Sequence, residues 1–401
     1  MRWFASICAL ALAGAATAAQ QGNPPDRDPV KTLVERLDLE RFKTTIKGLT
    51  QFGDRLEGTD RNRAAVDWIE AQLKSYGCPT ERHRYVKEPP PPAQPPQTAT
   101  PPPSPRITSG EVRIGEGGSR LRGTTRGTTP NNDPSRQPDA ALRARNAQPS
   151  VPGEREQVYC TKIGVTRPDE MYIVGAHMDG RGFGEGADDN ASGTALVMEV
   201  ARVLSSPDVQ TERSVRFILW NSEEGGLVGA RAYVADRARL QGEENPPGSR
   251  RYPEPRWRGM IQHDMVLFDH GMPRADGSIS PDQRPEADIN VEFQSNSNFA
   301  DESMKLAFFF RAANEKYAAD YPAAVGPHMT NTDSTPFMNL TPAISLREHE
   351  RGMHIGAGWN PHWHQPTDLF TTYSDDDFRL GLNAVQTTLG AIAELAGAVV
   401  R

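Results

Sequence analysis

The stretch that decides the fold begins with MYIVGA at residues 171–176 and ends with VRFILW at residues 215–220. Both runs are short and almost wholly apolar, which is typical of strands buried on both faces of a sheet. Between them, Leu196, Val200 and Val203 recur at helical spacing. A strand, a helix and a strand within about fifty residues form a βαβ unit, so the sequence predicts a parallel or mixed central sheet.

Helical patterns flank this unit on both sides. Residues 31–77 carry apolar residues three and four positions apart, and Thr59 or Asp60 is a candidate N-cap. Residues 82–86 could form a strand, and an amphipathic helix is predicted from Phe378 to Ala396. We therefore expect the N-terminal part, residues 19–87, to pack on the main body rather than to form a separate domain.

The first eighteen residues have the pattern of a secretory signal peptide. A basic start is followed by an apolar run from Trp3 to Ala16 and by small residues at a cleavage position. The run is too short for a typical membrane span, although an N-terminal anchor is the alternative. The pattern predicts export to the periplasm or outside the cell, with no stable membrane insertion after cleavage. There Cys78 and Cys160 could form a disulfide or remain two buried thiols, and the sequence leaves both open.

Composition sets further bounds on the 401-residue chain. Its formal net charge of −7 argues against nucleic-acid binding, which needs a basic face. Ten of the 34 prolines lie between Pro89 and Pro105, where they can neither pair in a sheet nor continue a helix. We predict a disordered insertion at 88–155, or alternatively a docking segment for a partner. Residues 156–401 would then form the catalytic domain.

Residues of metal-ligand type follow the predicted strands. The segments are HMD (177–179), GADDNASG (186–193), NSEE (221–224), HDM (263–265) and WHQPTD (363–368). Each alone is a weak signal, because buried histidines are often core residues and acidic pairs often cap helices. Together they are harder to obtain by chance, since functional groups in α/β sheets gather beyond the carboxyl ends of strands. Mixed imidazole and carboxylate ligands suit two divalent ions about 3.5–4 Å apart.

The combined pattern resembles the bacterial leucyl-aminopeptidase-type zinc exopeptidases of peptidase clan MH, with which glutaminyl cyclases share a fold. The resemblance covers about 158–400 and, weakly, the N-terminal helices. It implies an α/β fold of three layers, α/β/α, with helices on both faces of a mixed central sheet. It also implies a two-zinc site with a single bridging carboxylate. On the matching residues, His177 and Asp264 would hold one zinc ion, Glu224 and His364 the other, and Asp189 would bridge them.

The resemblance also implies catalytic roles. Glu223 would act as general base, and Asp179 would orient His177; spacing alone does not exclude Glu223 as the ligand instead of Glu224. The implied activity is hydrolysis of the N-terminal peptide bond by a hydroxide shared between two zinc ions. Mn²⁺ or Co²⁺ could substitute for Zn²⁺ at such ligands. The expected partners are peptides with a free N-terminus, and the expected state is a monomer.

Other interpretations stay open from the sequence. One is an enzyme of the same fold with another substrate, carboxypeptidase-like or a glutaminyl cyclase; another is a catalytically silent binding module. His354 and His362 compete with His364 as ligand, but only His364 precedes the family's Gln-Pro-Thr-Asp turn. Asp333 is either a pocket residue or a turn aspartate, and Trp363 stands where many relatives have tyrosine. No spacing rule gives the preferred substrate side chain.

Overall fold

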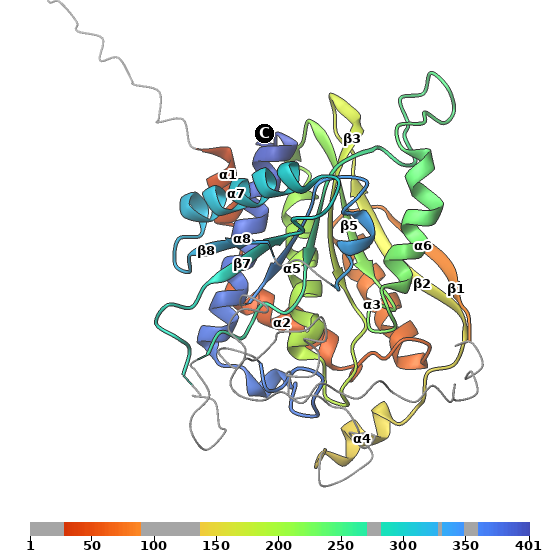
Figure 1. Cartoon of the computed structure of the whole chain (residues 1–401), viewed down its shortest axis with the longest axis vertical. Helices are drawn as coiled ribbons and strands as arrows, with labels where there is room; N and C mark the ends of the chain where they lie inside the picture. The colour runs from red at the N-terminus through yellow and green to blue at the C-terminus, as the bar shows by residue number, and fades with distance from the viewer. Residues whose placement is uncertain (1–27, 90–136, 271–281, 328–330, 349–359) are drawn as a thin grey trace, which may run out of the picture.

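The computed structural model describes residues 28–89, 137–270, 282–327, 331–348 and 360–401 (Figure 1). The predicted signal peptide and residues 90–136 of the predicted insertion lie outside these ranges. Within them, no helix combines the length and the apolar character needed to cross a membrane.

A mixed sheet of eight strands forms the centre of the described molecule, in the order β1-β2-β5-β3-β6-β9-β7-β8. Its strands are β1 (Thr80–Lys87), β2 (Gly153–Lys162), β3 (Arg167–His177), β5 (Arg213–Trp220), β6 (Arg256–His263), β7 (Ile289–Phe293), β8 (Ala323–Gly326) and β9 (Ala343–Arg347). The run β5-β3-β6-β9 is parallel throughout, whereas β1, β2 and β7 introduce antiparallel pairs. The short strands β4 (Val209–Gln210) and β10 (Val399–Val400) pair separately.

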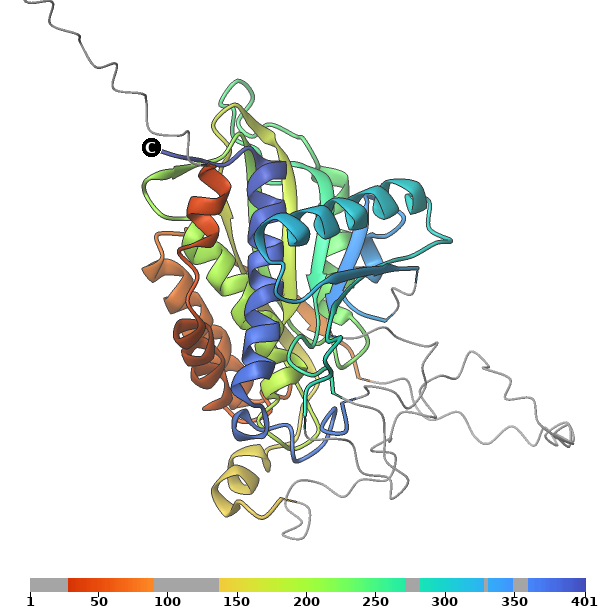
Figure 2. The same ribbon diagram turned by 90° about the vertical axis from the view of Figure 1, so that its left-hand side faces the viewer.

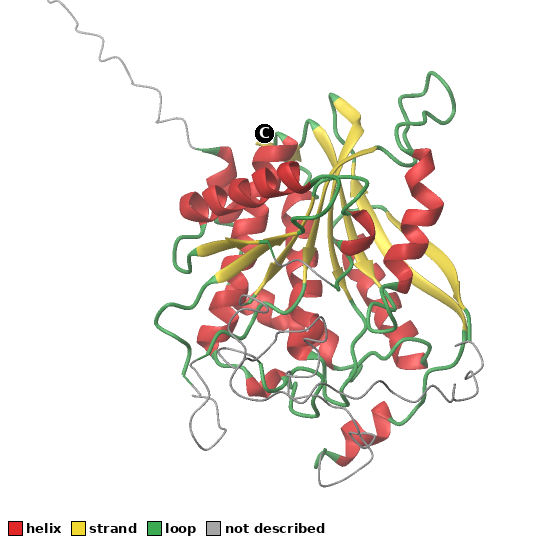
Figure 3. Cartoon of the chain, in the orientation of Figure 1, coloured by secondary structure: helices red, strands yellow, loops and turns green. Residues whose placement is uncertain are grey.

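Helices cover both faces of this sheet, as Figures 2 and 3 show. The α-helices are α1 (Pro29–Val34), α2 (Leu39–Thr50), α3 (Asp60–Ser75), α4 (Ala140–Asn146), α5 (Gly193–Leu204), α6 (Val228–Arg237), α7 (Ala300–Tyr317) and α8 (Asp375–Ala396). The shorter helices are η2 (Ala187–Ser192), η3 (Ala238–Leu240), η4 (Thr335–Phe337) and η5 (Phe370–Thr372). The larger core cluster includes residues of α1, α2, α3, α5, α7 and α8, and the smaller one lies under α6 and η4. The predicted three-layer α/β/α fold is confirmed.

Strand β3 illustrates why the apolar runs form the centre. Val174 and Ala176 belong to the larger cluster, whereas Met171 and Ile173 belong to the smaller one on the opposite face. Successive side chains of a strand point to opposite faces, so a continuous apolar run is buried on both. The prediction from MYIVGA is therefore confirmed.

The N-terminal helices pack on the same core, and their ends follow local rules. Thr59 is the N-cap of α3, and its side chain accepts a hydrogen bond from the backbone N–H of Asn62 at 3.3 Å. The segment from 51 to 59, here called the α2–α3 connector, leads directly into this cap. Beyond α3, a disulfide joins Cys78 to Cys160 of β2. The structure thus has the bridge that the sequence left open.

The predicted insertion extends too far at its C-terminal end. Residues 140–146 form α4, and β2 begins at Gly153. The Asn146 side chain is buried, accepts from the Asp54 N–H at 3.1 Å and donates to the Gly184 carbonyl at 2.8 Å. The prediction of disorder is wrong for 137–155. This segment is held by hydrogen bonds between polar side chains and main-chain groups, and such bonds leave no apolar pattern in the sequence.

Candidate metal centre

Three neighbouring parallel strands bring the predicted site residues together. His177 is the last residue of β3, Asp264 follows β6, and Glu223 and Glu224 follow β5. Because these strands are parallel and adjacent, their carboxyl ends meet at one edge of the sheet.

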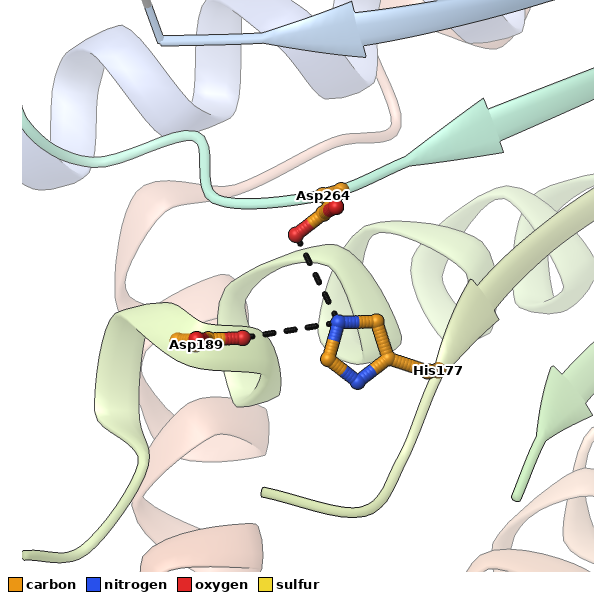
Figure 4. A group of neighbouring side chains, drawn as sticks. All are labelled: His177, Asp189 and Asp264. Carbon is orange, nitrogen blue, oxygen red and sulfur yellow. Dashed lines mark hydrogen bonds and ion pairs between the residues drawn. The ribbon is translucent and has the colours of Figure 1, made fainter. Parts of the chain in front are cut away.

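The first group of side chains consists of His177, Asp189 and Asp264 (Figure 4). Nε2 of His177 lies 3.4 Å from Oδ1 of Asp189 and 3.4 Å from Oδ1 of Asp264. All three residues are buried. Nδ1 of His177 donates to the Asp179 main-chain carbonyl at 2.9 Å, which leaves Nε2 as the atom that faces the two carboxylates.

The second group consists of Asp189, Glu224 and His364. Nε2 of His364 lies 3.0 Å from Oδ2 of Asp189 and 2.9 Å from Oε1 of Glu224. Asp189 therefore presents one carboxylate oxygen to each group. In both groups the potential ligand atoms lie within 4.8 Å of one another. Two sets of imidazole and carboxylate ligands around a shared carboxylate fit a pair of divalent transition-metal ions.

A turn of unusual backbone places Asp189 between the groups. It lies in η2, where Asp189 itself has non-helical φ and ψ of −102° and 91°. The N–H groups of Asp188 and Asp189 donate to the buried Asp368 carboxylate at 2.9 and 3.1 Å. Asp368 thus holds the turn that carries the shared carboxylate.

The carboxylates around His177 and His364 favour the protonated form of both imidazoles. Burial lowers the pKa of His364, but Glu224 and Asp189 raise it by more, to about 9. The pKa of His177 is likewise raised well above 6.5, because Glu223 and Asp264 outweigh burial. Since a metal ion binds neutral imidazole, it must displace these protons.

Glu223 lies beside both groups. Burial and the charges of Glu224 and Asp333 raise its pKa well above 4.5, against the opposing effect of His177. Glu223 also lines a small cavity of about 40 Å³ together with the five residues of the two groups, Asn331 and Trp363. A carboxylate with a raised pKa inside such a cavity suits proton transfer.

Asp179 contacts His177 differently from the expectation. Its main-chain carbonyl, not its carboxylate, accepts the 2.9 Å hydrogen bond from Nδ1; the carboxylate oxygen lies 3.9 Å from that atom. The carboxylate instead accepts the N–H groups of Glu223 at 3.1 Å and Glu224 at 3.3 Å. Asp179 therefore connects the loop after β3 to the loop after β5.

The neighbouring candidates fall outside the two groups. His263 is buried, and its ring contacts the Gly175 carbonyl and the Thr388 hydroxyl. The ring of His362 contacts the Thr367 hydroxyl. His354 lies outside the described residues. Asp333 is a fully buried residue of a turn, and it accepts a hydrogen bond from the Gln262 side chain at 3.2 Å. The Trp363 ring stacks on His364 with ring centroids 4.0 Å apart.

Sequence reasoning missed two supporting residues. One is Asp368, the last residue of the WHQPTD segment, whose carboxylate holds the turn that carries Asp189. Its position four residues after His364 is the signal that could have indicated this role. Arg347 gave no such signal, because it ends the apolar strand β9, yet its Nη2 lies 2.9 Å from Oδ2 of Asp264.

The family model described as peptidase family M28 matches residues 159–385. The chain belongs to this family. Aminopeptidase YwaD of Bacillus subtilis (strain 168) is 44% identical over 70 residues, which are 18% of this chain and 15% of YwaD. The chain thus matches only a small part of this curated relative's length.

Solved structures share the fold over most of the chain. The aminopeptidase from Aneurinibacillus sp. strain AM-1 has a TM-score of 0.54 and 18% identity, over 93% of this chain and 97% of that one. The glutaminyl cyclase of Porphyromonas gingivalis has a TM-score of 0.53 and 16% identity, over 89% and 98%. At these identities the likeness concerns the fold.

Proposed function

We propose that the protein is an exported dizinc aminopeptidase that hydrolyses the N-terminal peptide bond of peptides. The observation that carries the proposal is the pair of ligand groups that share Asp189, with Glu223 beside both. Membership of peptidase family M28 and the likeness to YwaD, which is named as an aminopeptidase, support the same activity.

In this proposal His177 and Asp264 would hold one ion, Glu224 and His364 would hold the other, and Asp189 would contribute to both. Two divalent ions here would lower the pKa of a shared water toward 7 and polarise the scissile carbonyl. Glu223 takes up the proton at its carboxylate and delivers it to the leaving amine. Asp179 fixes the positions of both glutamates through their N–H groups.

The two arginines nearest the site face proposed metal ligands, which argues against a substrate held by its free carboxylate. Arg181 and Arg347 approach the site but face the carboxylates of Glu224, at 3.7 Å, and Asp264, at 2.9 Å. A carboxypeptidase would use such a cation to bind the substrate C-terminus, whereas here each faces a proposed metal ligand.

Two features support export. The N-terminal signal pattern is one. The disulfide between Cys78 and Cys160 is the other, because such bonds persist mainly in oxidising compartments.

The test is a paired assay on the mature purified protein. Bound metal per chain is measured, and hydrolysis of aminoacyl-nitroanilides is followed with and without a chelator. We expect about two zinc ions per chain, as at a two-metal site, and release that the chelator abolishes. Cyclisation of an N-terminal glutamine with one ion per chain would identify a cyclase. Cleavage of N-terminally blocked peptides would identify a carboxypeptidase, and no turnover of any of these substrates a silent module.

A further inference from the structure

An arginine of the α2–α3 connector, Arg55, contacts the loops that carry the candidate metal centre. Arg55 is fully buried, and each of its three guanidinium nitrogens donates to a main-chain carbonyl oxygen. The backbone of Arg55 has a φ of 53°, a conformation that residues other than glycine rarely adopt. A residue in this conformation is retained only where the surrounding structure stabilises it.

One of the four carbonyls that Arg55 contacts, that of Gly53 at 3.0 Å, lies in the connector itself, and the other three belong to two loops of the candidate metal centre. Nε donates at 2.8 Å to Met178, the residue between His177 and Asp179. Nη1 donates at 2.6 Å to Glu185 and Nη2 at 2.8 Å to Gly186, which lead into the turn that carries Asp189. One planar side chain therefore connects the loop of the first histidine to the turn of the shared carboxylate.

The chain is packed closely around this guanidinium. A Cβ atom at Gly186 would lie 2.8 Å from Nη2 of Arg55, and Gly186 has a φ of 58°. A Cβ atom at Gly180 would lie 2.8 Å from the Asp189 carbonyl. Contacts under 3.0 Å require the neighbours to shift, so these glycines let the loops approach the arginine and each other.

The charge of Arg55 also lies among carboxylates of the site. Burial lowers the pKa of its guanidinium, whereas the charges of Asp368, Asp54 and Asp179 raise it. The positive charge offsets part of the negative charge collected there when no metal is bound. By electrostatics alone, however, a buried cation would oppose the binding of metal ions, so a role in favour of binding must come from geometry.

We propose that Arg55 is a positioning residue of the metal centre, which holds His177 and Asp189 at their mutual distance before a metal ion binds. The inference rests on the proposed function, since it concerns the same ligands. Residues that orient metal ligands from behind typically contribute about 10- to 100-fold to metal affinity. Arg55 would act on two ligands at once through their main chain.

The experiment compares Arg55→Lys with Arg61→Lys. Arg61 is a matched control because it is buried too and lies near the start of α3, but it donates to the Asp54 carboxylate and the Gln148 carbonyl, each at 2.9 Å. Both changes keep the positive charge and remove the planar fork of donors. Zinc affinity is measured by competition with a chromophoric chelator, and thermal unfolding of each metal-free protein is recorded.

We expect Arg55→Lys to bind zinc about 10- to 100-fold more weakly than the unsubstituted protein, and Arg61→Lys to bind it normally. Equal zinc affinity of Arg55→Lys and the unsubstituted protein would overturn the inference, as would an equal loss in both variants. If the unsubstituted protein itself binds no zinc, the proposed metal centre fails and the inference with it. The two proposals can thus fail separately. Zinc binding by the unsubstituted protein supports the metal centre, and weaker binding in Arg55→Lys alone supports the role of Arg55.

A second variant serves if Arg55→Lys does not fold. Gly186→Ala leaves Arg55 in place but sets a methyl group against Nη2. Gly248→Ala is its control, because Gly248 also has a positive φ, of 79°, and a Cβ atom there would have no described neighbour within 4 Å. We expect weaker zinc binding in Gly186→Ala alone, and unchanged binding there would overturn the inference.

Discussion

Glu223 and Glu224 are consecutive residues that face different neighbours. Glu224 lies 2.9 Å from His364 within the second ligand group, whereas Glu223 lines the cavity without belonging to either group. We therefore expect Glu223→Gln to keep its metal and to lose about 10²- to 10⁴-fold in turnover, the usual contribution of a general base. Metal content and kcat are measured on the same sample.

Glu224→Gln is the matched variant, because it makes the same chemical change one position along the chain. It should lose metal as well as turnover, since an amide is a poorer ligand than a carboxylate. Unchanged kcat in Glu223→Gln would refute its role as base. Loss of metal in Glu223→Gln alone would favour the exchanged assignment.

Arg347 supports the first ligand group from strand β9. It is 2% exposed and lies 2.9 Å from the Asp264 carboxylate and 3.2 Å from that of Glu292. Burial alone would raise the pKa of Asp264, but Arg347 and His177 lower it below its usual range. Arg347→Met should therefore make Asp264 easier to protonate, weaken zinc binding about 10-fold or more and destabilise the fold by about 3 kcal/mol or more.

These effects are checked by zinc titration at pH 7.5 and 6.0 and by urea unfolding. The deficit in zinc binding should grow toward pH 6.0, because the proton competes with the metal. Arg347→Lys, which keeps the charge, should recover most of the binding. An Arg347→Met protein with normal affinity at both pH values would contradict the argument.

The sequence could predict the candidate ligands, but not the residues that support them. His177, Glu224 and Asp264 stand directly at strand ends, where an apolar run shows the position and the residue type shows the chemistry. Arg55 and Arg347 have no such marks, because an arginine in a connector or a strand is usually exposed. Their partners are carbonyls and carboxylates that come close only in the folded chain.

At the level of elements, the pair β1–β2 contains a histidine suited only to its neutral form. His83 is buried, with Nε2 2.8 Å from the Asp236 carboxylate and Nδ1 2.9 Å from the amide nitrogen of Gln157. That amide also donates to the Gly229 carbonyl at 3.0 Å. If Nδ1 were protonated, its N–H group would face the N–H group of the Gln157 amide, and neither could accept a hydrogen bond.

Burial lowers the pKa of His83 below 6.5, the value expected when the chain is unfolded. The unfolded state thus binds more protons than the folded state. The contribution of neutral His83 to the free energy of unfolding is therefore complete above pH 6.5 and declines as the pH falls below it. We expect the thermal midpoint of the chelator-treated protein to fall between pH 7.5 and 5.5. His83→Gln, which cannot titrate, should lose less over the same interval. An equal loss in the variant would show that other groups carry the effect.

Helix α4 changes what a deletion in the predicted insertion should do. Gln137 donates to the carbonyls of Phe183 at 3.1 Å and Pro366 at 3.0 Å, next to the loops of the metal centre. We expect a chain in which a short Gly-Ser linker replaces 90–136 to keep its peptidase activity. Extending the deletion through 155 should abolish activity, because it removes α4 and the start of β2.

Activity and thermal midpoint of the two deletion proteins provide the comparison. Equal activity of both would show that α4 is dispensable. Inactivity of the shorter deletion with its metal content intact would show that 90–136 helps to form the site.

The sequence predicts an element well where one pattern dominates. The strands at 171–176 and 215–220 and the last helix follow directly from apolar periodicity. α4 is short and polar, with Leu142 and Asn146 as its buried residues, so its position depends on hydrogen bonds to distant main-chain groups. No periodicity records such bonds.

For the molecule as a whole, the disulfide ties the N-terminal helices to the sheet. Cys78 and Cys160 are 82 residues apart, and closing so long a loop restricts the unfolded chain considerably. We expect the double change Cys78→Ala and Cys160→Ala to lower the free energy of unfolding by about 4 kcal/mol. Urea unfolding with and without a reductant tests this, and the reductant should have no effect on the double variant. A reductant-insensitive midpoint in the unsubstituted protein would contradict the prediction.

The same bond also determines what a protease can separate. It encloses every residue from 79 to 159, including the whole proline-rich run. A single cut anywhere within that interval leaves both fragments on one covalent molecule. After such a cut the helices before Cys78 stay attached to the sheet that carries the metal centre. A protein cut once in this region thus remains one covalent molecule, and its two fragments become separable only when the cut is combined with chemical reduction.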